Sequence, residues 1–374
     1  MNDLSLHSEC AGALSRLVER PRQLTAFVGL DGFVDEIVHV VDKRQNATTY
    51  TRIPTIAAYA ARLAGAAGRS TNIEIVNQLT KLGGNGPIMA NALASFGINV
   101  TYLGTVGRPN LHPVFAGLAK RAEVHSIADA CHTDALEFDD GKILVGKSTP
   151  LNEVTWPNIQ ERFGREQFER KFQDSSLVAF VNWTMIPYMS DIWAALLSEL
   201  CPRLNGPRRM IFFDLADPEK RRADDVCNAL KLISQFQKHF DVILGLNEKE
   251  AFEVAGPLGI KTHGDSVGDL SKLAKEIQQH LGIHTLAVHP VSFALAVCGG
   301  AVDVAQGPYI QTPLITTGAG DHFNAGFCLG KLLDLSNAMC VLLGVTTSGH
   351  YVRTAQSPDV PALIRMLRNW PSEK

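Results

Sequence analysis

The residues best suited to chemistry lie in one glycine-rich turn, Thr316-Thr-Gly-Ala-Gly-Asp321, which leads into a helical pattern. Small residues at 318–320 let backbone N–H groups point to one spot at the start of a helix, an arrangement that binds anions. A carboxylate directly after the turn suits a base that takes a proton from a hydroxyl attacking a held phosphoryl group. The alternative is that Asp321 is an ordinary first-turn acid, stabilised by the helix dipole.

A second polar pair, Asn247 and Glu250, follows a short apolar run that begins at residue 241. We expect this pair where a strand meets the next helix, at the sheet edge where open α/β proteins place ligands. An amide and a carboxylate there suit Mg²⁺, which keeps water ligands and takes few from protein. The alternative is a helix N-cap completed by Glu250 in a capping box, and both interpretations can hold together.

A third pattern, from Gly141 to Ser148, matches the P-loop signature G-x-x-x-x-G-K-[ST]. A working P-loop follows a buried strand and opens a helix, whose N-terminal amides hold phosphate. Here a hairpin turn comes before the pattern, and Pro150 disfavours helical geometry at Thr149. We therefore do not interpret this segment as a nucleotide site.

The elements that must position these residues alternate along the chain. Apolar runs predict strands at 25–29, 100–103, 177–181, 210–214 and 241–244, and helical patterns cover 55–67, 87–96, 192–201, 226–239, 270–281, 323–333 and 338–351. Residues 135–145 and 286–304 read as strand pairs with turns. Such alternation predicts a mostly parallel sheet covered on both faces.

Composition excludes several classes of protein. Lys+Arg 35 against Asp+Glu 38 leaves no excess of positive charge to hold a nucleic acid. The seven cysteines form no C-x-x-C pair, which is typical of free thiols in a reducing compartment. No apolar run reads as a signal peptide or a membrane span. We expect a cytoplasmic protein without membrane or nucleic-acid partners.

The order of three motifs carries a resemblance. Gly83-Gly84 before a helix, Asn247-x-x-Glu250 and Gly-Ala-Gly-Asp321 together resemble the PfkB/ribokinase family of carbohydrate kinases, from about Phe27 to about Arg353. The resemblance implies a ribokinase-like three-layer α/β sandwich with a central, mostly parallel sheet and a small β lid. Residues 1–22 would be an N-terminal extension and residues 23–374 the kinase domain, with lid segments near 36–50 and 126–150.

The resemblance also implies roles for individual residues. Asp321 would be the catalytic base, with the amides of Gly318, Ala319 and Gly320 as the anion hole. Thr316, Thr317 and Asn247 would contact the ATP, Asn247 and Glu250 would organise Mg²⁺, and Asp31, Asp35, Gly83, Gly84 and Asn85 would line the acceptor site. Lid strands would allow a homodimer.

Three positions depart from the family pattern. Ile315 stands where an Asp commonly helps to bind a monovalent cation, and Ile88 stands where an Asn often contacts sugar. The segment 288–293, with His289 and Pro290, replaces a glycine-containing turn against the nucleotide. These departures bear on the cation site, the acceptor and the nucleotide contacts.

The hypothesis is therefore ATP-dependent phosphoryl transfer to a hydroxyl of a sugar or related small polyol. One alternative is a ribokinase-like nucleotide- or metabolite-binding regulatory protein that has lost the reaction. The other is a dehydrogenase that uses Gly83-Gly84-Asn-Gly86 as a dinucleotide turn, but G-x-G-x-x-G is incomplete there.

Overall fold

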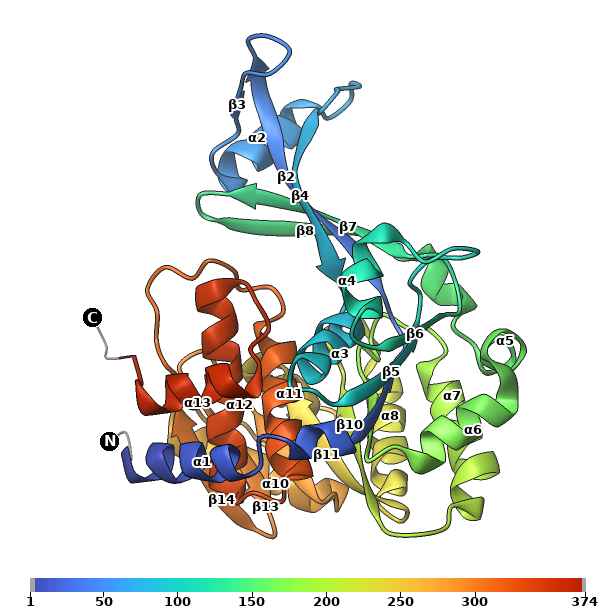
Figure 1. Ribbon diagram of the computed structural model, residues 1–374. Coiled ribbons are helices and arrows are strands. Elements are labelled where there is room, and N and C mark those ends of the chain that lie inside the picture. The colour runs from blue at the N-terminus through green and yellow to red at the C-terminus, as the bar shows by residue number, and fades with distance from the viewer. Residues whose placement is uncertain (1–3, 372–374) are drawn as a thin grey trace.

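Two sheets of different size organise the chain in the computed structural model, which describes residues 4–371 (Figure 1). The large sheet has nine strands in the order β14-β13-β12-β11-β10-β9-β1-β5-β6. These strands are β1 (Thr25–Gly29), β5 (Asn99–Gly104), β6 (Glu123–Ser126), β9 (Leu177–Phe180), β10 (Arg209–Asp214), β11 (Phe240–Leu246), β12 (Thr285–Val288), β13 (Phe293–Cys298) and β14 (Ala301–Gln306). The pairs from β6 to β12 are parallel, and β13 and β14 extend the sheet antiparallel.

Helices cover both faces of this sheet, as the sequence predicts. One core packs strand side chains such as Phe213 against α6 (Arg165–Asp174), α7 (Met189–Ala195), α8 (Ala223–Phe236), α9 (Glu248–Ala255) and α10 (Val267–Leu281). The other packs alternate side chains such as Phe212 against α1 (Leu4–Arg16), α3 (Asn85–Ser95), α11 (Ala319–Leu332), α12 (Asn337–Thr354) and α13 (Val360–Arg368). Because neighbouring strand residues point to opposite faces, both layers bury apolar area, and the three-layer fold is confirmed.

Some elements differ from the sequence prediction. The helices α6 and α13 were not expected, since short polar or proline-bearing segments carry a weak helical signal. The predicted helix 192–201 is α7 followed by a π-helical turn, Leu196–Leu200. Cys10 and Leu14 of the N-terminal segment are fully buried, so α1 belongs to the main core.

The small sheet stands above one end of the large one (Figure 1). It contains β2 (Phe33–Arg44), β3 (Tyr50–Arg52), β4 (Ile75–Gly83), β7 (Cys131–Phe138) and β8 (Gly141–Lys147), with α2 (Ile56–Gly65) packed on it. The P-loop-like pattern lies on β8 and is followed by a 3₁₀ turn, which agrees with its rejection. Strand β4 leads directly through Gly83-Gly84 into α3. The small sheet is therefore joined to the start of a helix that packs on the large sheet.

The helices α11 and α12 pack closely through small residues. A Cβ placed on Gly326 would lie 2.2 Å from Oγ1 of Thr347 and 2.6 Å from the carbonyl oxygen of Leu343. A Cβ on Gly344 would lie 2.5 Å from the ring of Phe323. Because Gly326 and Gly344 have no side chains, α11 and α12 can pack this closely. This packing fixes the position of α11 and of Asp321 in its first turn.

We expect Gly326→Ala to lower the free energy of unfolding by about 1–3 kcal/mol, the usual cost of overpacking a core. The matched control is Gly65→Ala at the end of α2, where a Cβ meets nothing within 4 Å. That variant should be neutral or stabilised by up to about 1 kcal/mol. Urea unfolding of the three proteins measures both effects. Equal stabilities would contradict the close α11–α12 contact.

Candidate active site

The N-terminus of α11 presents backbone N–H groups that no part of the described chain satisfies. Gly318 caps the helix with φ 95°, a left-handed conformation that favours glycine, and a Cβ there would lie 3.1 Å from Ile88 Cδ1. Ala319 donates its N–H to the Thr316 carbonyl (3.1 Å) inside the turn. Within residues 4–371, the N–H groups of Gly318, Gly320 and Asp321 have no acceptor. Of the three amides expected to form an anion hole, those of Gly318 and Gly320 are free, and that of Ala319 is engaged. The free N–H group of Asp321 lies next to them in the chain.

Asp321 lies directly beside these amides and is 7% exposed. Its Oδ1 accepts a hydrogen bond from Nδ2 of Asn85 at 3.0 Å. Burial raises the pKa of Asp321 to about 8, although the Asn85 hydrogen bond and the charge of Lys81 act in the opposite direction. The carboxyl group is therefore poised to exchange a proton near neutral pH.

Asp31 holds the start of α3 in place. Its carboxylate accepts from the N–H of Asn85 (3.0 Å), the N–H of Gly86 (2.9 Å) and Nδ2 of Asn182 (2.7 Å). A Cβ on Gly84 would lie 3.0 Å from Oδ2 of Asp31, which explains the glycine at this turn. Burial raises the pKa of Asp31 to about 6. The result is that the Asn85 side chain is directed to Asp321.

Asp35 faces the same region from the small sheet. It pairs in register with Lys81 across β2 and β4, and the Lys81 Nζ lies 3.7 Å from Asp35 Oδ2. A Cβ on Gly83 would overlap the Asp35 carboxylate at 2.2 Å, so only glycine permits this approach. Sequence reasoning found Asp35 and Gly83 but missed Lys81, because a lone lysine in a polar strand carries no motif.

Asn247 and Glu250 form the capping box of α9. Asn247 Oδ1 accepts the N–H of Glu250 (2.9 Å), and Glu250 Oε2 accepts the N–H of Asn247 (2.8 Å). The other carboxylate oxygen accepts the N–H of Asp217 at 3.0 Å. Burial raises the pKa of Glu250, so this carboxylate lies in a poorly solvated position.

Asp214, at the end of β10, is a buried acid that sequence reasoning missed. Its Oδ2 accepts from Nδ2 of Asn324 (2.9 Å), whereas its Oδ1 has no hydrogen-bond partner within residues 4–371, although the nearby Ala216 N–H lowers the pKa of this carboxyl group. Burial raises the pKa of Asp214 well above its usual range, with Glu250 and Asp321 adding to the effect. In the described chain, no three His, Cys, Asp or Glu side chains are grouped to hold a metal. Asp214, Asn247 and Glu250 carry side-chain oxygen atoms, which is the donor type that Mg²⁺ takes in proteins.

A cavity of about 420 Å³ adjoins the amides of α11. Its wall is mainly apolar and comes from the segment after β12, the loop after β14 and the inner side of α12: His289, Pro290, Val291, Pro308, Ile310, Pro313, Val345, Val352 and, at its polar end, Asn247, Thr316, Ala319 and Gly320. The His289 ring lies 4.8 Å from that of Phe323, and burial lowers the pKa of His289 to about 4. The segment that departs from the family pattern therefore lines this cavity with a neutral imidazole.

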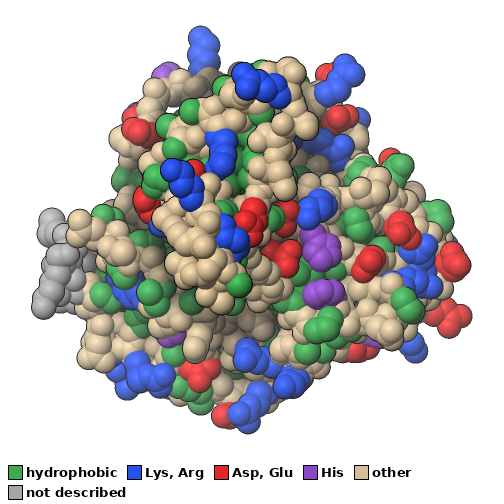
Figure 2. Space-filling view, turned by 90° about the horizontal axis from the view of Figure 1, so that it is seen from above, with side chains coloured by type: hydrophobic (Ala, Val, Ile, Leu, Met, Phe, Trp, Pro, Cys, Tyr) green, Lys and Arg blue, Asp and Glu red, His purple; other side chains and the backbone are tan. Residues whose placement is uncertain are grey.

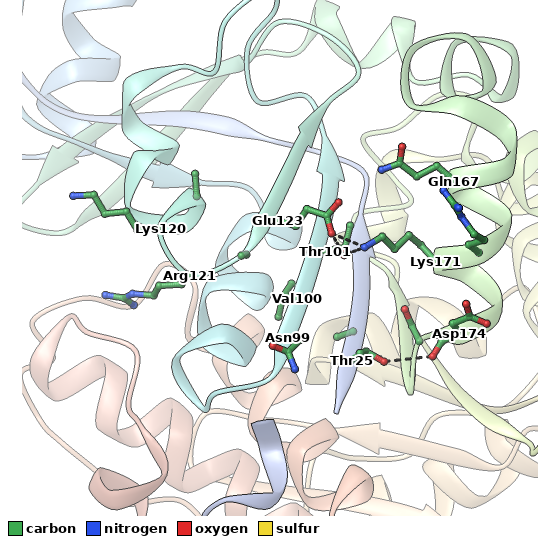
Figure 3. A pocket seen from close by; sticks show the side chains of 15 residues that line it. Thr25, Asn99, Val100, Thr101, Lys120, Arg121, Glu123, Gln167, Lys171 and Asp174 are labelled. Carbon is green, nitrogen blue, oxygen red and sulfur yellow. Dashed lines mark hydrogen bonds and ion pairs between the residues drawn. The ribbon is translucent and has the colours of Figure 1, made fainter. Parts of the chain in front are cut away.

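A larger cavity, of about 760 Å³, lies at the opposite end of the strands (Figure 3). Thr25 and Asn99, the first residues of β1 and β5, are part of its wall. The Lys171 ammonium points into it but already bonds Thr101 Oγ1 (2.9 Å) and Glu123. The labelled Lys120 and Arg121 side chains extend away from Lys171. The polar side chains that meet here, those of Lys171, Thr101 and Glu123, bond one another, so the size of the cavity alone does not indicate a site.

The acidic cluster, in contrast, lies where the parallel strands end. Asp31, Asn182, Asp214 and Asn247 follow or end β1, β9, β10 and β11, and Asp321 faces them from α11. Figure 2 looks onto this end of the molecule, where acidic, basic and histidine side chains gather near the middle of the face. Open α/β sheets bind ligands at this edge.

The fold is shared with solved carbohydrate kinases of the ribokinase-like, PfkB type. The chain superposes on ribokinase from Arabidopsis thaliana complexed with ribose and ATP with a TM-score of 0.64 and 16% identity, covering 92% of this chain and 98% of that one. For a carbohydrate kinase from Agrobacterium tumefaciens the TM-score is 0.63, with 16% identity and coverage of 92% and 97%.

Sequence comparison defines the family within this class. Residues 6–370 match the model of prokaryotic ketohexokinase. The chain is also 30% identical over 356 residues to a ketohexokinase from Haloferax volcanii, covering 95% of this chain and 92% of that protein. This protein therefore belongs to the prokaryotic ketohexokinase family of carbohydrate kinases. None of the helices within residues 4–371 has the length and apolar character needed to cross a bilayer.

The raised pKa of Asp321 predicts how stability depends on pH. Between the usual pKa, 3.8, and the folded value of about 8, the folded protein binds more protons than the unfolded chain, so rising pH destabilises the fold. We expect Asp321→Asn to gain melting temperature relative to wild type as pH rises from 4 to 8, and the gap to level off above 8. Asp334→Asn, at an exposed position just beyond α11, is the control. A gap that does not change with pH would contradict the burial argument.

Proposed function

We propose that this sugar kinase transfers the terminal phosphoryl group of ATP to a hydroxyl of a ketohexose. The observation that carries the proposal is the position of Asp321, between three unsatisfied amides and the polar groups around Asp31, at the edge of the 420 Å³ cavity. The name of the Haloferax volcanii relative supports the acceptor, and the Arabidopsis ribokinase complex with ATP supports the donor.

The acceptor hydroxyl would lie against the Asp321 carboxylate, which takes its proton. Asn85 would orient that carboxylate through its hydrogen bond to Oδ1. Asp31 and Asp35 would face the sugar from the two sides of Gly83-Gly84. Because phosphoryl transfer passes through a loose transition state, holding the hydroxyl in line contributes more than a strong base would.

The nucleotide would occupy the apolar cavity. Its base would pack between the segment at His289 and the inner side of α12, and its phosphates would reach the N–H groups of Gly318, Gly320 and Asp321. Three donors and the positive end of α11 would stabilise the negative charge that these phosphates carry. Thr316 and Asn247 line the same cavity and would contact the phosphate chain.

Asn247, Glu250 and Asp214 would hold a hydrated Mg²⁺ close to the phosphates. Bound there, the ion would neutralise charge on the phosphoryl groups. The two backbone N–H groups that bond Glu250 fix its carboxylate in one orientation. The unpartnered Oδ1 of Asp214 adds a second oxygen donor at this edge.

The small sheet would act as a lid. Covering the site would exclude water, which competes with the sugar as acceptor. Its strands β4 and β8 also expose Leu79, Leu144 and Val145, which are 55%, 59% and 45% exposed. Exposed apolar side chains on one sheet support pairing with a second copy of the chain through the lid.

A coupled ATP-consumption assay with fructose, glucose, ribose and a nucleoside tests the proposal. Turnover with the ketohexose above the other acceptors is the expected result. Thermal shifts with ATP and Mg²⁺ detect binding separately from turnover. Stabilisation by ATP without turnover on any acceptor would support the regulatory alternative instead.

Asp321→Asn should lower kcat by about 10²–10⁴-fold, the usual loss when a general base is removed. The dissociation constant for ATP should stay within a few-fold of the wild-type value, because the Asp321 side chain would face the sugar. The side-chain oxygen of the new Asn can still accept the hydrogen bond from Asn85. Initial rates and calorimetric titration measure the two quantities. A variant with kcat near wild type would remove Asp321 from the mechanism.

Glu250→Gln should raise the Mg²⁺ concentration needed for half-maximal rate, because a neutral amide binds a hydrated cation less well than a carboxylate. The control is Glu248→Gln, which makes the same charge change on the first turn of α9 at a half-buried position. Initial rates of wild type and both variants are measured over a series of Mg²⁺ concentrations at saturating ATP. The same Mg²⁺ dependence in all three proteins would leave Glu250 with its capping role alone.

A further inference from the structure

One charged side chain near the reaction centre comes from the small sheet and has no role so far. Lys81 lies on β4, two residues before Gly83, and its side chain is only 16% exposed. Its ammonium lies 3.7 Å from Asp35 Oδ2, its one ion-pair partner among the described residues. The ion pair leaves hydrogen-bond donors of the ammonium unused, since an ammonium group has three.

The groups that face Lys81 come from both layers of the site. They are Asp35 on β2, Lys142 on β8, and Asp321 and His322 on α11. Asp321 in turn is faced by Asn85, Asp31, Glu250, Asp214 and Tyr351. Burial lowers the pKa of Lys81, while the charges of Asp35 and Asp321 favour its ammonium form. Lys81 is the lysine or arginine whose charge acts on Asp321 in this cluster.

The surroundings of Lys81 are acidic, and a phosphoryl group would add negative charge to them. Burial raises the pKa values of the acids that gather here, which are Asp31, Asp35, Asp214, Glu250 and Asp321. The three free N–H groups described above all belong to one helix terminus, the start of α11. A cation from the small sheet would balance the charge from the other side, where the acceptor enters.

We propose that Lys81 is a catalytic residue whose ammonium contacts the phosphoryl group during transfer, opposite the amides of α11. In that step the acceptor oxygen forms a bond to the γ-phosphorus, and its proton passes to Asp321. The bond from the γ-phosphorus to the bridging oxygen breaks, and its electron pair stays on ADP. Lys81 neither gains nor loses a proton, and it stabilises the charge on the equatorial oxygens.

The location of Lys81 on the small sheet gives the proposal a second consequence. The Lys81 ammonium would reach the reaction centre only while β4 lies over the large sheet. Closure of the small sheet over the site would therefore also place this positive charge beside the phosphoryl group. Water entering an open site would meet the amides and Asp321 without this cation. The proposal rests on the proposed kinase function and deepens it.

The test compares Lys81→Met, Lys81→Arg and Lys147→Met. Lys147 is the matched control, because it lies on β8 of the same small sheet and pairs with Asp134 at 3.0 Å, away from the groups that face Lys81. We expect Lys81→Met to lower kcat by about 10²–10³-fold, as for removal of one transition-state donor. The dissociation constant for ATP and the KM for the sugar should change by less than about fivefold. Lys81→Arg should recover most of the loss, and Lys147→Met should keep the wild-type kcat.

Four results would overturn the assignment. A wild-type kcat in Lys81→Met, with Asp321→Asn inactive, would remove Lys81 and leave the kinase function standing. A rise in the KM for the sugar at unchanged kcat would make Lys81 an acceptor contact instead. A large drop in melting temperature that Lys81→Arg does not reverse would make its role structural. Wild-type protein without turnover on any sugar would overturn the proposed function itself, and the Lys81 assignment with it.

Discussion

The start of α11 is the feature on which the rest of the site depends. Three N–H groups there have no partner among the described residues, and Asp321 lies beside them with its pKa raised by burial to about 8. A buried acid is costly, so the fold must hold it by packing elsewhere. The close contact of α11 with α12 at Gly326 and Gly344 supplies that packing. A ligand with negative charge would satisfy what the protein leaves open.

The other buried acids differ in how far the protein satisfies them. Asp31 accepts from two N–H groups at the start of α3, and Glu250 accepts from the N–H groups of Asn247 and Asp217. Each therefore fixes a helix or loop as well as facing the site. Asp214 keeps one oxygen without a hydrogen-bond partner in the described part of the chain. Asp31 and Glu250 therefore position backbone segments, whereas Asp214 has an oxygen that the protein does not use in this way.

The path from β4 through Gly83-Gly84 into α3 links the small sheet to the catalytic layer. Lys81 precedes this turn, and Asn85, which bonds Asp321, follows it. Gly83 permits the approach of Asp35, and Gly84 permits that of Asp31. One short segment therefore fixes the positions of four side chains: Asp31, Asp35, Lys81 and Asn85. Asn85 connects this segment to Asp321 through one hydrogen bond.

Local signals in the sequence determined much of this protein. Alternating apolar runs and helical patterns predict the parallel sheet and its two helical layers, and the motif at Asp321 predicts an anion site at a helix start. These signals can be read from the sequence because backbone propensity and hydrophobic periodicity depend on only a few neighbouring residues. Only the tertiary structure decided which amides remain free, and it exchanged Ala319 for Asp321 in that set. The tertiary structure also places Lys81 and Asp214 near the other polar groups of the site. Neither residue stands in a sequence motif, and burial and neighbouring charge arise only when distant segments meet in the folded chain.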